Sequence, residues 1–369
     1  MSGAVADLPA AGEATPSGLG AAPGSTVAIA PSLSPNQRAW LRFRRNRIGY
    51  WSLWIFIALL VLSTFAELIC NDRPLVARYG GELYFPLFHN QPETRFGGDF
   101  GTPTDWKDPF VASQFSKPGN WAFFTLVPHS ANSVDYFEKL PSPTGPSATD
   151  WLGTDGSGHD MVARLLYGFR VSIWFAIALT LVGTVLGIVA GAVQGYFGGK
   201  VDLFSQRLME IWGAVPELYL LIIFASIFEP SLLLLLVLLS AWGWIGLSDY
   251  VRAEFLRNRS LEFVKAARAL GLSNAQIIRR HVLPNSLTPV ITFLPFRMSG
   301  AIIALTSLDF LGLGVPASTP SLGDLLRQGK NNLDAWWIIF PTFVLLVVAM
   351  LLLTFIGDAL RDAFDTRKS

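Results

Sequence analysis

The sequence contains a single cysteine, Cys70, among 369 residues. One thiol cannot form an intrachain disulfide and argues against a metal–thiolate site. Charged residues make up only 15% of the chain, and a net charge of +1 argues against a nucleic-acid partner. The sequence also lacks a Gly-x-x-x-x-Gly-Lys-Ser/Thr phosphate loop, since the nearest stretch, Gly198-Gly199-Lys200-Val201, has neither the first glycine nor the hydroxyl. We therefore expect that the chain does not hydrolyse ATP itself.

Hydrophobic residues, in contrast, make up 51% of the chain, which is too many for an ordinary soluble protein of this length. We predict an all-α polytopic membrane protein, because helices of roughly 20 apolar residues cross a bilayer. The hydrophobic runs predict six spans, at about residues 48–66, 171–193, 204–228, 232–247, 287–311 and 335–356.

Basic residues flank these runs on one side of the predicted membrane. A cluster stands directly before the first span and consists of Arg38, Arg42, Arg44, Arg45 and Arg47. We interpret it as a positive-inside signal rather than as a nucleic-acid or lipid-specific patch. Further basic residues follow the fourth and sixth spans, so both termini are expected in the cytoplasm.

The predicted organisation has five parts. Residues 1–35 are rich in Ala, Gly, Pro and Ser and are expected to form a disordered cytoplasmic tail. Residues 36–70 form a basic amphipathic lead-in and the first span, and residues 71–165 form an insert on the outer side. Residues 166–357 form a five-helix core that includes a cytoplasmic loop at 251–285, and residues 358–369 form a cytoplasmic tail.

The insert is polar, rich in Pro and Gly, and aromatic, which predicts a small ordered unit of short strands and turns. His89, His129 and His159 lie in it without the spacing of metal ligands, so no metal site is expected. A glycine-rich turn at residues 151–160 leads back to the membrane. Its Asp155 and Asp160 either cap helix ends or touch a docked protein, and capping is the preferred interpretation.

Three of the charged residues inside predicted spans are candidates for the wall of a translocation pathway: Glu210, Glu217 and Arg297. Charges are costly in lipid and should face protein, water or another charge. Alternatively, Glu210 pairs with a basic residue such as Arg207 near the membrane interface, or Arg297 neutralises Glu210 or Glu217. Pro216 is expected to bend the third span.

Glycines recur at every fourth position of the second span. They are Gly183, Gly187 and Gly191, and the count continues at Gly195 and Gly199. Such a stripe lets another helix approach closely. We expect the partner helix to come from this chain rather than from another subunit.

A polar, basic stretch at residues 260–285 separates the fourth span from the fifth. It predicts two short helices joined at a corner. Ser260 should cap the first helix and Gly271 should end it. A capping box of Ser273 and Gln276 opens the second, and Pro284 should kink or stop it.

One face of the first predicted helix is low and apolar. It carries Phe263, Ala266, Ala267 and Leu270 at the i, i+3, i+4, i+7 spacing. Its two central alanines would let another protein surface approach closely. The alternative is a plain amphipathic loop that lies on the membrane surface.

The spacing within this stretch resembles the cytoplasmic coupling loop of ABC importer permeases. The matching pattern is Ala266-Ala267, three residues, Gly271, nine residues, the position of His281, and then Leu283-Pro284. Lys265 stands where the general family pattern has Glu, and His281 where it has Ile, which is typical of the oligopeptide/dipeptide branch. The contact with the ATPase is then expected to rest on Ala266, Ala267 and Gly271 rather than on a salt bridge.

Other segments carry the same resemblance, which covers the chain from about residue 44 to its end apart from the insert. Residues 151–170 and the stretch Phe310-Leu-Gly-Leu-Gly314 with Val315-Pro316 resemble segments of the second permease in oligopeptide-type pairs. The basic Phe-Arg-Arg-Asn-Arg start and the long insert resemble permeases of the peptide importers that also take up microcin C.

This resemblance implies a six-helix type I ABC importer permease in a bacterial inner membrane, with a periplasmic insert. It implies import of peptides, including oligopeptides and microcin C-like conjugates, by alternating access. The implied partners are a second homologous permease, cytoplasmic ATP-binding subunits, a periplasmic substrate-binding protein and membrane lipid. No cofactor and no catalytic residue are expected on this chain, because ATP and Mg would bind the partner ATPase. The implied coupling residues are Phe263, Lys265, Ala266, Ala267, Leu270, Gly271, His281, Leu283 and Pro284.

Two other classes stay open on the residues alone. A secondary transporter or channel would work without ATP, but it normally shows internal repeats or paired broken helices, and no convincing repeat is present. A membrane enzyme would use the insert as its catalytic part. Glu82, Asp99 and Asp105 are available carboxylates there, but they form no recognisable constellation with a nucleophile or metal triad.

Overall fold

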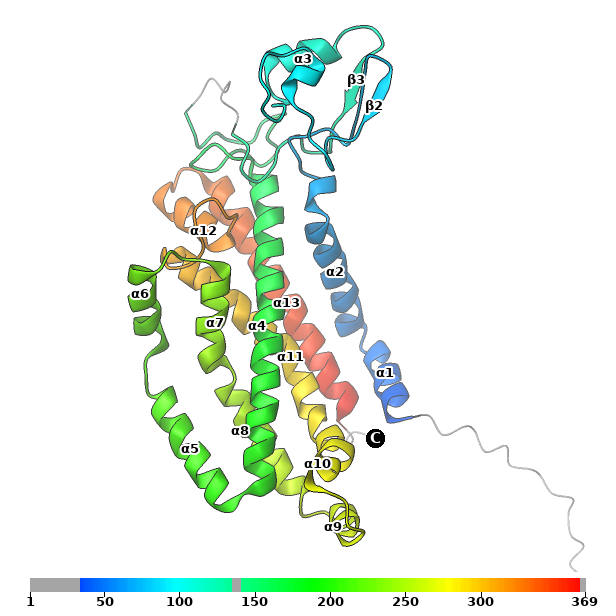
Figure 1. Cartoon of the computed structure of the whole chain (residues 1–369), viewed down its shortest axis with the longest axis vertical. Coiled ribbons are helices and arrows are strands. Elements are labelled where there is room, and N and C mark those ends of the chain that lie inside the picture. Colours follow the sequence, from blue (N-terminus) through cyan, green and yellow to red (C-terminus); the bar gives the residue numbers. More distant parts are fainter. Residues whose placement is uncertain (1–33, 135–140, 366–369) are drawn as a thin grey trace, which may run out of the picture.

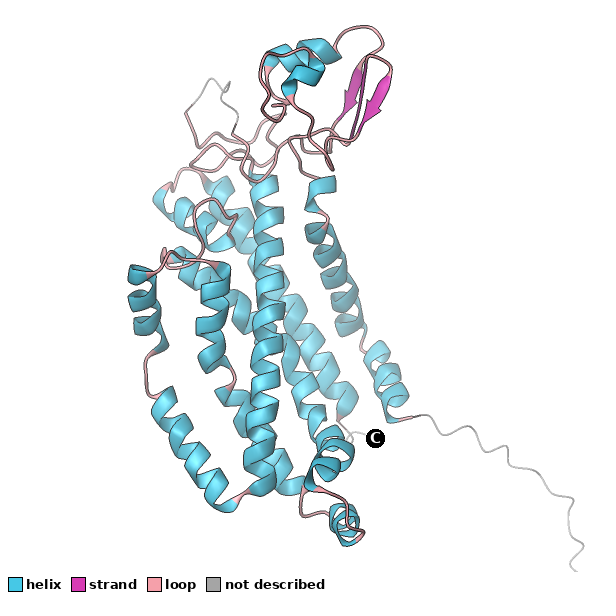
Figure 2. Cartoon of the chain, in the orientation of Figure 1, coloured by secondary structure: helices cyan, strands magenta, loops and turns pink. Residues whose placement is uncertain are grey.

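A computed structural model describes residues 34–134 and 141–365 of the chain. Long helices run side by side along the molecule, a small lobe with strands lies at one end, and the short helix α9 lies at the other (Figures 1 and 2). We call these the lobe end and the loop end. The disordered segment predicted at 1–35 lies outside the described residues except for its last two, and residues 366–369 of the predicted tail also lie outside them.

Two helices lead into the bundle. Ser34 and Gln37 form a capping box that opens α1 (Pro35–Arg45). Asn46 separates the two helices and caps α2 (Arg47–Thr64) by accepting a hydrogen bond of 3.1 Å from the Gly49 amide. The buried face of α1 includes Phe43, which packs on α13 (Trp336–Phe364). A 3-10 turn at Ala66–Leu68 then leads into the lobe.

The lobe confirms the predicted unit of short strands and turns. Its antiparallel strands β1 (Val76–Tyr79), β2 (Glu82–Tyr84) and β3 (Trp121–Phe123) lie in the order β2-β1-β3. A 3-10 turn at Glu93–Phe96 and helix α3 (Pro109–Phe115) cover the sheet. Ala77, Phe96, Trp106 and Val111 are buried together and form a core separate from that of the helix bundle.

Helix α4 (Met161–Phe197) is the long central element. Its 37 residues span about 55 Å at the usual rise of about 1.5 Å per residue, so it extends well beyond the predicted span at 171–193. The glycine stripe faces α8, since a Cβ at Gly187 would lie 3.0 Å from the Leu247 Cβ and one at Gly195 would lie 2.5 Å from the Phe255 Cβ. The expected packing within this chain is therefore confirmed. Gly199 falls outside the stripe, at the turn that starts α5.

The predicted third span at 204–228 is not one continuous helix. The structure has α5 (Gly199–Gly213) and α6 (Glu217–Ile227), which are bent by 61° relative to each other. The break falls at Pro216, which has no N–H for a helical hydrogen bond and keeps the preceding residue out of the helical region. The proline that was expected to bend the span therefore interrupts it.

The fourth predicted span is too short. It continues from α7 (Leu232–Gly243) into α8 (Ile245–Asn258), so the coupling loop begins at residue 259 rather than 251. Val251 and Phe255 explain the extension, because they are buried one helical turn apart in a cluster that includes Ala192 and Tyr196 of α4. The helix is thus stabilised by packing beyond the end of its apolar run.

The rest of the chain returns from the loop end to the lobe end and back. Helices α9 (Glu262–Ala269) and α10 (Asn274–Ile277) precede a π-helical turn at Ile278–Val282. Helix α11 (Leu283–Phe310) then crosses to α12 (Leu322–Asn331), and α13 runs back. Phe169, Ile302 and Leu353, from α4, α11 and α13, lie in one buried core between these helices.

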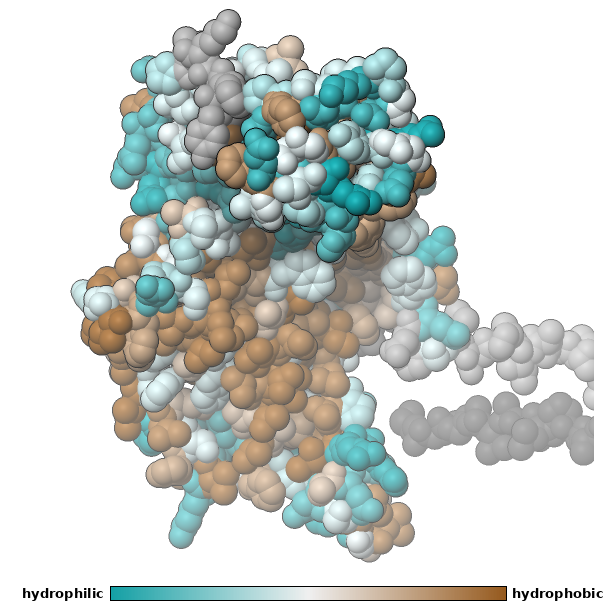
Figure 3. Space-filling model, turned by 45° about the horizontal axis from the view of Figure 1, so that its top comes forward, coloured by the Kyte–Doolittle hydropathy of each residue, from teal (hydrophilic) through white to brown (hydrophobic). Residues whose placement is uncertain are grey.

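Length and hydropathy identify the membrane-crossing elements. Within the described residues, five helical segments are long and apolar enough to span a bilayer, or six if the bent α5–α6 pair counts as one span. Figure 3 shows hydrophobic side chains over the middle of the molecule and hydrophilic ones over the lobe. The predicted fold class, a helical membrane protein with a small insert between its first helices, is confirmed.

Candidate functional site

The coupling loop, residues 259–285, is tied to the ends of two long helices. Arg259 Nη1 donates a hydrogen bond of 3.0 Å to the Tyr196 carbonyl at the end of α4, and the Tyr196 hydroxyl donates one of 2.8 Å to Asn274 Oδ1. The buried Asn258 Nδ2 donates to Ser286 Oγ in α11 at 2.8 Å. The loop is therefore a rigid extension of the bundle rather than a segment lying loosely on its surface.

Helix α9 has one buried face and one exposed face. The four residues that were predicted to share one face, Phe263, Ala266, Ala267 and Leu270, are divided between the two. Val264 and Ala267 are buried against α4, α8 and α10. Phe263 and Ala266 are exposed, and Leu270 is 80% exposed. Ala267 therefore belongs to the core of this chain, and the prediction that it shares an outward face with Ala266 is wrong. The outward face still carries apolar side chains on an otherwise polar loop, which marks an interaction surface.

The local signals within the loop are mostly as predicted. Gly271 adopts φ +79° and closes α9 with the paired hydrogen bonds of a Schellman motif. Ser273 and Gln276 form the expected capping box. Ser260, however, does not cap α9, because its hydroxyl donates to the Arg257 carbonyl at 2.8 Å.

Lys265 and His281 both make contacts inside the loop. Lys265 Nζ lies 2.8 Å from Glu262 Oε1, so its charge is paired on the exposed side of α9. The ring of His281 lies beside that of Phe263, with centroids 6.4 Å apart. His281 of the signature therefore lies next to Phe263 on the exposed face of α9.

Pro284 does not stop the second helix, so the prediction that the helix could end there is wrong. The chain passes through the π-helical turn at Ile278–Val282 and continues as α11, with half-buried Leu283 at its first position. The wider π turn accommodates the proline ring, which in an α-helix would clash with the Arg280 carbonyl. The Asn285 side chain donates to the His281 carbonyl at 2.7 Å.

Two of the three pathway candidates line one cavity in the middle of the bundle. Glu217 at the start of α6 and Arg297 in α11 border a space of about 200 Å³ together with Thr180 of α4. Arg297 Nη2 donates a hydrogen bond of 2.9 Å to the Gly243 carbonyl, where the end of α7 leaves an acceptor without a helical partner. Arg297 Nε and Thr180 Oγ1 are buried and have no hydrogen-bond partner among the described residues. Both atoms are thus unsatisfied polar groups beside the cavity.

Glu210 lies elsewhere. It forms an ion pair with Arg207 on exposed α5, as the alternative interpretation predicted. Among the described residues, neither Glu210 nor Glu217 forms an ion pair with Arg297, which instead donates to the Gly243 carbonyl. The candidate cavity therefore retains Glu217 and Arg297 only.

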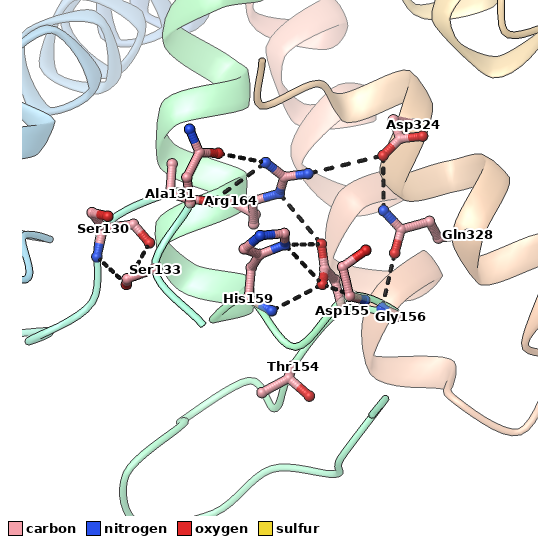
Figure 4. Close-up of polar contacts among 12 residues, drawn as sticks. Ser130, Ala131, Ser133, Thr154, Asp155, Gly156, His159, Arg164, Asp324 and Gln328 are labelled. Carbon is pink, nitrogen blue, oxygen red and sulfur yellow. Dashed lines mark hydrogen bonds and ion pairs between the residues drawn. The ribbon is translucent and has the colours of Figure 1, made fainter. Parts of the chain in front are cut away.

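A second polar site lies at the lobe end, where the glycine-rich turn meets α4 and α12 (Figure 4). Asp155 is fully buried and pairs with His159 Nδ1 at 3.1 Å and with Arg164 Nε at 3.3 Å. Burial alone would raise the pKa of Asp155, but the hydrogen bonds from His159 and the charges of His159 and Arg164 outweigh it and hold that pKa below its ordinary value. The turn is thus held by a buried ionic cluster.

Helix α12 completes this cluster and was missed from the sequence. Gln328 Oε1 accepts from the Gly156 amide, and Gln328 Nε2 donates to Asp324, each at 2.8 Å. A signal for α12 was present, because Ser321 precedes Leu322 and Leu325 in the pattern of an N-cap followed by an amphipathic turn. The preferred capping role is confirmed for Asp160, which caps α4 through the Ala163 amide at 2.8 Å. Asp155 instead organises the turn.

Comparison with known proteins places this architecture in a family. Residues 183–369, more than half of the chain, match the family model described as the binding-protein-dependent transport system inner membrane component. The chain belongs to this permease family. Residues 34–92 match a second model, the N-terminal TM domain of oligopeptide transport permease C.

Two relatives match this permease over nearly its whole length. The Inner membrane ABC transporter permease protein YejE of Escherichia coli K12 is 48% identical over 91% of this chain and 99% of its own. The Peptidoglycan transport system permease protein YejE of Agrobacterium fabrum is 44% identical over 92% of this chain and 95% of its own. A solved chain of the MetNI methionine ABC transporter, in an inward-facing conformation, is 20% identical with a TM-score of 0.47 and covers 55% of this chain and 97% of that chain.

The permease is therefore the membrane component of an ABC importer and a multi-pass protein of the inner membrane, rather than an enzyme. Its family works with an ATPase and a binding protein, which confirms the predicted class and decides against an ATP-independent transporter. No group of three His, Cys, Asp or Glu side chains among residues 34–134 and 141–365 is arranged to hold a metal ion.

Proposed function

We propose that this permease carries peptides inward through a pathway shared with a second, homologous permease, and that a separate ATPase drives it through the outward face of α9. The single observation that carries the coupling role is the exposed apolar face of Phe263, Ala266 and Leu270 on a loop rigidly tied to α4 and α11. A rigid loop transmits a displacement, whereas a loose one would absorb it. ATP and Mg bind the partner ATPase in this scheme, and a periplasmic binding protein delivers the solute.

Peptides are the proposed solutes for two reasons. The chain resembles peptide permeases, including the Dipeptide transport system permease protein DppC of Lactococcus lactis, which is 31% identical over 94% of both chains. The cavity also presents both charges, since Glu217 and Arg297 line it together. A peptide carries an amino and a carboxylate group that these side chains would attract in a site of low dielectric. The two termini lie on the cytoplasmic side in this arrangement, and the lobe lies in the periplasm.

The coupling role is tested by comparing two exposed alanines. Ala266→Glu places a bulky charge on the outward face of α9, and Ala275→Glu places the same charge on exposed α10, outside that face. With the partner subunits in proteoliposomes, ATP-dependent peptide uptake should be lost in Ala266→Glu and retained in Ala275→Glu, while both proteins insert normally. Wild-type uptake by Ala266→Glu would show that this face does not carry the coupling.

The cavity is tested by thiol accessibility. Cys70 is buried and burial raises its pKa to about 12, so the native thiol should react little and a Cys70→Ala background should report introduced thiols alone. Glu217→Cys and Arg297→Cys should react with aqueous thiol reagents to an extent that changes with nucleotide state. If both stay unreactive in every nucleotide state, they do not line a pathway.

A further inference from the structure

The loop end contains a larger cavity, between α1, α8, α11 and α13. Its volume is about 700 Å³. Arg38 and Arg42 of α1 line one side, and Glu254 and Arg257 of α8 line the other. The first turns of α11 and the last turn of α13 close it. Side chains from four helices therefore converge on one space.

The charges around this cavity do not balance. Glu254 is paired with Arg257 at 2.7 Å. Arg42 donates a hydrogen bond of 3.1 Å to the Asp365 carbonyl oxygen, which is an uncharged acceptor. Within the described part of the chain, no carboxylate forms an ion pair with Arg38 or Arg42. Among the residues that line the cavity, three arginines thus stand against one carboxylate, which favours an anionic occupant.

The position of the cavity identifies the class of that anion. On α1, Ala39 and Phe43 are buried, but the neighbouring Trp40 and Leu41 are 48% and 46% exposed. Exposed tryptophan beside arginine, directly before a membrane-spanning helix, is the pattern of a helix at the boundary between water and lipid. An anion at this depth meets the headgroups of the bilayer.

A second cavity of about 570 Å³ adjoins the first one and shares Thr288, Pro289 and Phe364 with it. Its walls include the rings of Tyr250, Phe293 and Phe296, and also Arg361 and Asp365. An arginine-lined compartment next to one that contains three further aromatic rings can accommodate the two parts of a phospholipid. The first would hold the phosphate and the second would hold part of an acyl chain.

We propose that this paired cavity is a binding site for an anionic phospholipid, with its headgroup phosphate between Arg38 and Arg42. The bound lipid links α1 to α8 and α11, the two helices that flank the coupling loop. The assignment does not depend on which solute the importer carries. It also gives part of the basic cluster before α2 a specific role in addition to its effect on orientation.

Native mass spectrometry of the permease purified with its partner subunits tests this assignment, with phosphatidylglycerol, phosphatidylcholine and inorganic phosphate as probes. Arg38→Gln/Arg42→Gln should weaken phosphatidylglycerol binding about thirtyfold, and Arg38→Gln alone about fivefold, because each arginine near an anionic headgroup contributes about 1 kcal/mol. The matched control Arg44→Gln/Arg45→Gln removes two charges from the same helix outside the cavity. It should change binding several times less.

Several results would overturn the assignment. Equal weakening in the matched control would show bulk attraction to the membrane instead of a site. Equal binding of phosphatidylcholine would show that charge is not recognised, and displacement of the lipid by inorganic phosphate would identify a free-anion site. Retained lipid binding with lost co-purification of the ATPase would identify the arginines as a protein contact. Arg38 is exposed and makes no side-chain hydrogen bond among the described residues, so its single variant should fold and keep the test decisive.

Discussion

Replacing Gly191 with alanine should weaken the contact between α4 and α8 that supports the coupling loop. A Cβ at this position would lie 2.8 Å from the Val251 Cβ and 2.9 Å from the Arg252 amide nitrogen, and it would also contact the Ser248 carbonyl oxygen. Two of these three atoms belong to the backbone of α8 and cannot rotate away. The methyl group can therefore fit only if the two helices separate.

The loss of stability in Gly191→Ala is best measured against the same substitution at a matched glycine, Gly300. Gly300 lies inside α11 as Gly191 lies inside α4, but a Cβ there would have no atom within 4 Å. Both substitutions gain the same helix propensity, about 1 kcal/mol, so the difference between them isolates the packing. Overpacking a well-packed contact costs about 1–3 kcal/mol, and the backbone contacts place Gly191→Ala toward the upper end.

Thermal unfolding of the two purified variants in the same detergent measures this difference. At roughly 2–4 °C per kcal/mol, Gly191→Ala should melt several degrees below Gly300→Ala. ATP-dependent uptake by Gly191→Ala should also fall, because α8 leads directly into the loop. A melting temperature equal to or above that of Gly300→Ala would refute close packing between α4 and α8 at this point.

Three further predictions concern buried charges. Burial raises the pKa of Asp160 to about 6. The ionised carboxylate therefore destabilises the fold by about 3 kcal/mol above about pH 6, and this effect is absent below about pH 4. Asp160→Asn should raise the melting temperature at pH 8 and leave it nearly unchanged at pH 4. Arg164→Gln should destabilise the fold by about 3–5 kcal/mol in thermal unfolding, because Asp155 loses its buried partner, and adding Asp155→Asn should recover part of that loss. Gly183→Ala would place a methyl group 2.5 Å from Arg297 Nη2, so peptide uptake should fall while the melting temperature changes little, because a flexible side chain can move aside.

Local sequence signals predicted two helix ends in the coupling loop at the level of single residues. Gly271 and Ser273 act through hydrogen bonds within a few positions of the chain, so their roles follow from neighbouring residues alone. The orientation of Ala267 could not be obtained in this way. Two adjacent alanines are equally small, and only the position of α4 and α8 decides that Ala267 is buried and Ala266 exposed.

Contacts between segments far apart in the sequence also explain the errors in the predicted spans. Hydropathy ended the fourth span at residue 247, but Val251 and Phe255 extend the helix because they pack against α4. Pro284 was expected to kink or stop a helix, and the helix instead continues past it through a π-helical turn. The contact between Arg164 and Asp324 was not predictable, since these two residues come together only when α12 folds back onto the start of α4.

The elements that flank the coupling loop also reach the cavity, and this suggests how a movement at α9 changes the pathway. The segment formed by α7 and α8 ends at the loop and contributes the Gly243 carbonyl that holds Arg297. Helix α11 begins at the other end of the loop and carries Arg297 itself. The hydrogen bond between them therefore joins two helices whose loop ends are linked through Asn258 and Ser286. Because α4 is packed without a gap against α8, a displacement of the loop cannot be absorbed there. In the mechanism that we propose, it would instead change the position of α8 relative to α11, and thus the group that Arg297 contacts.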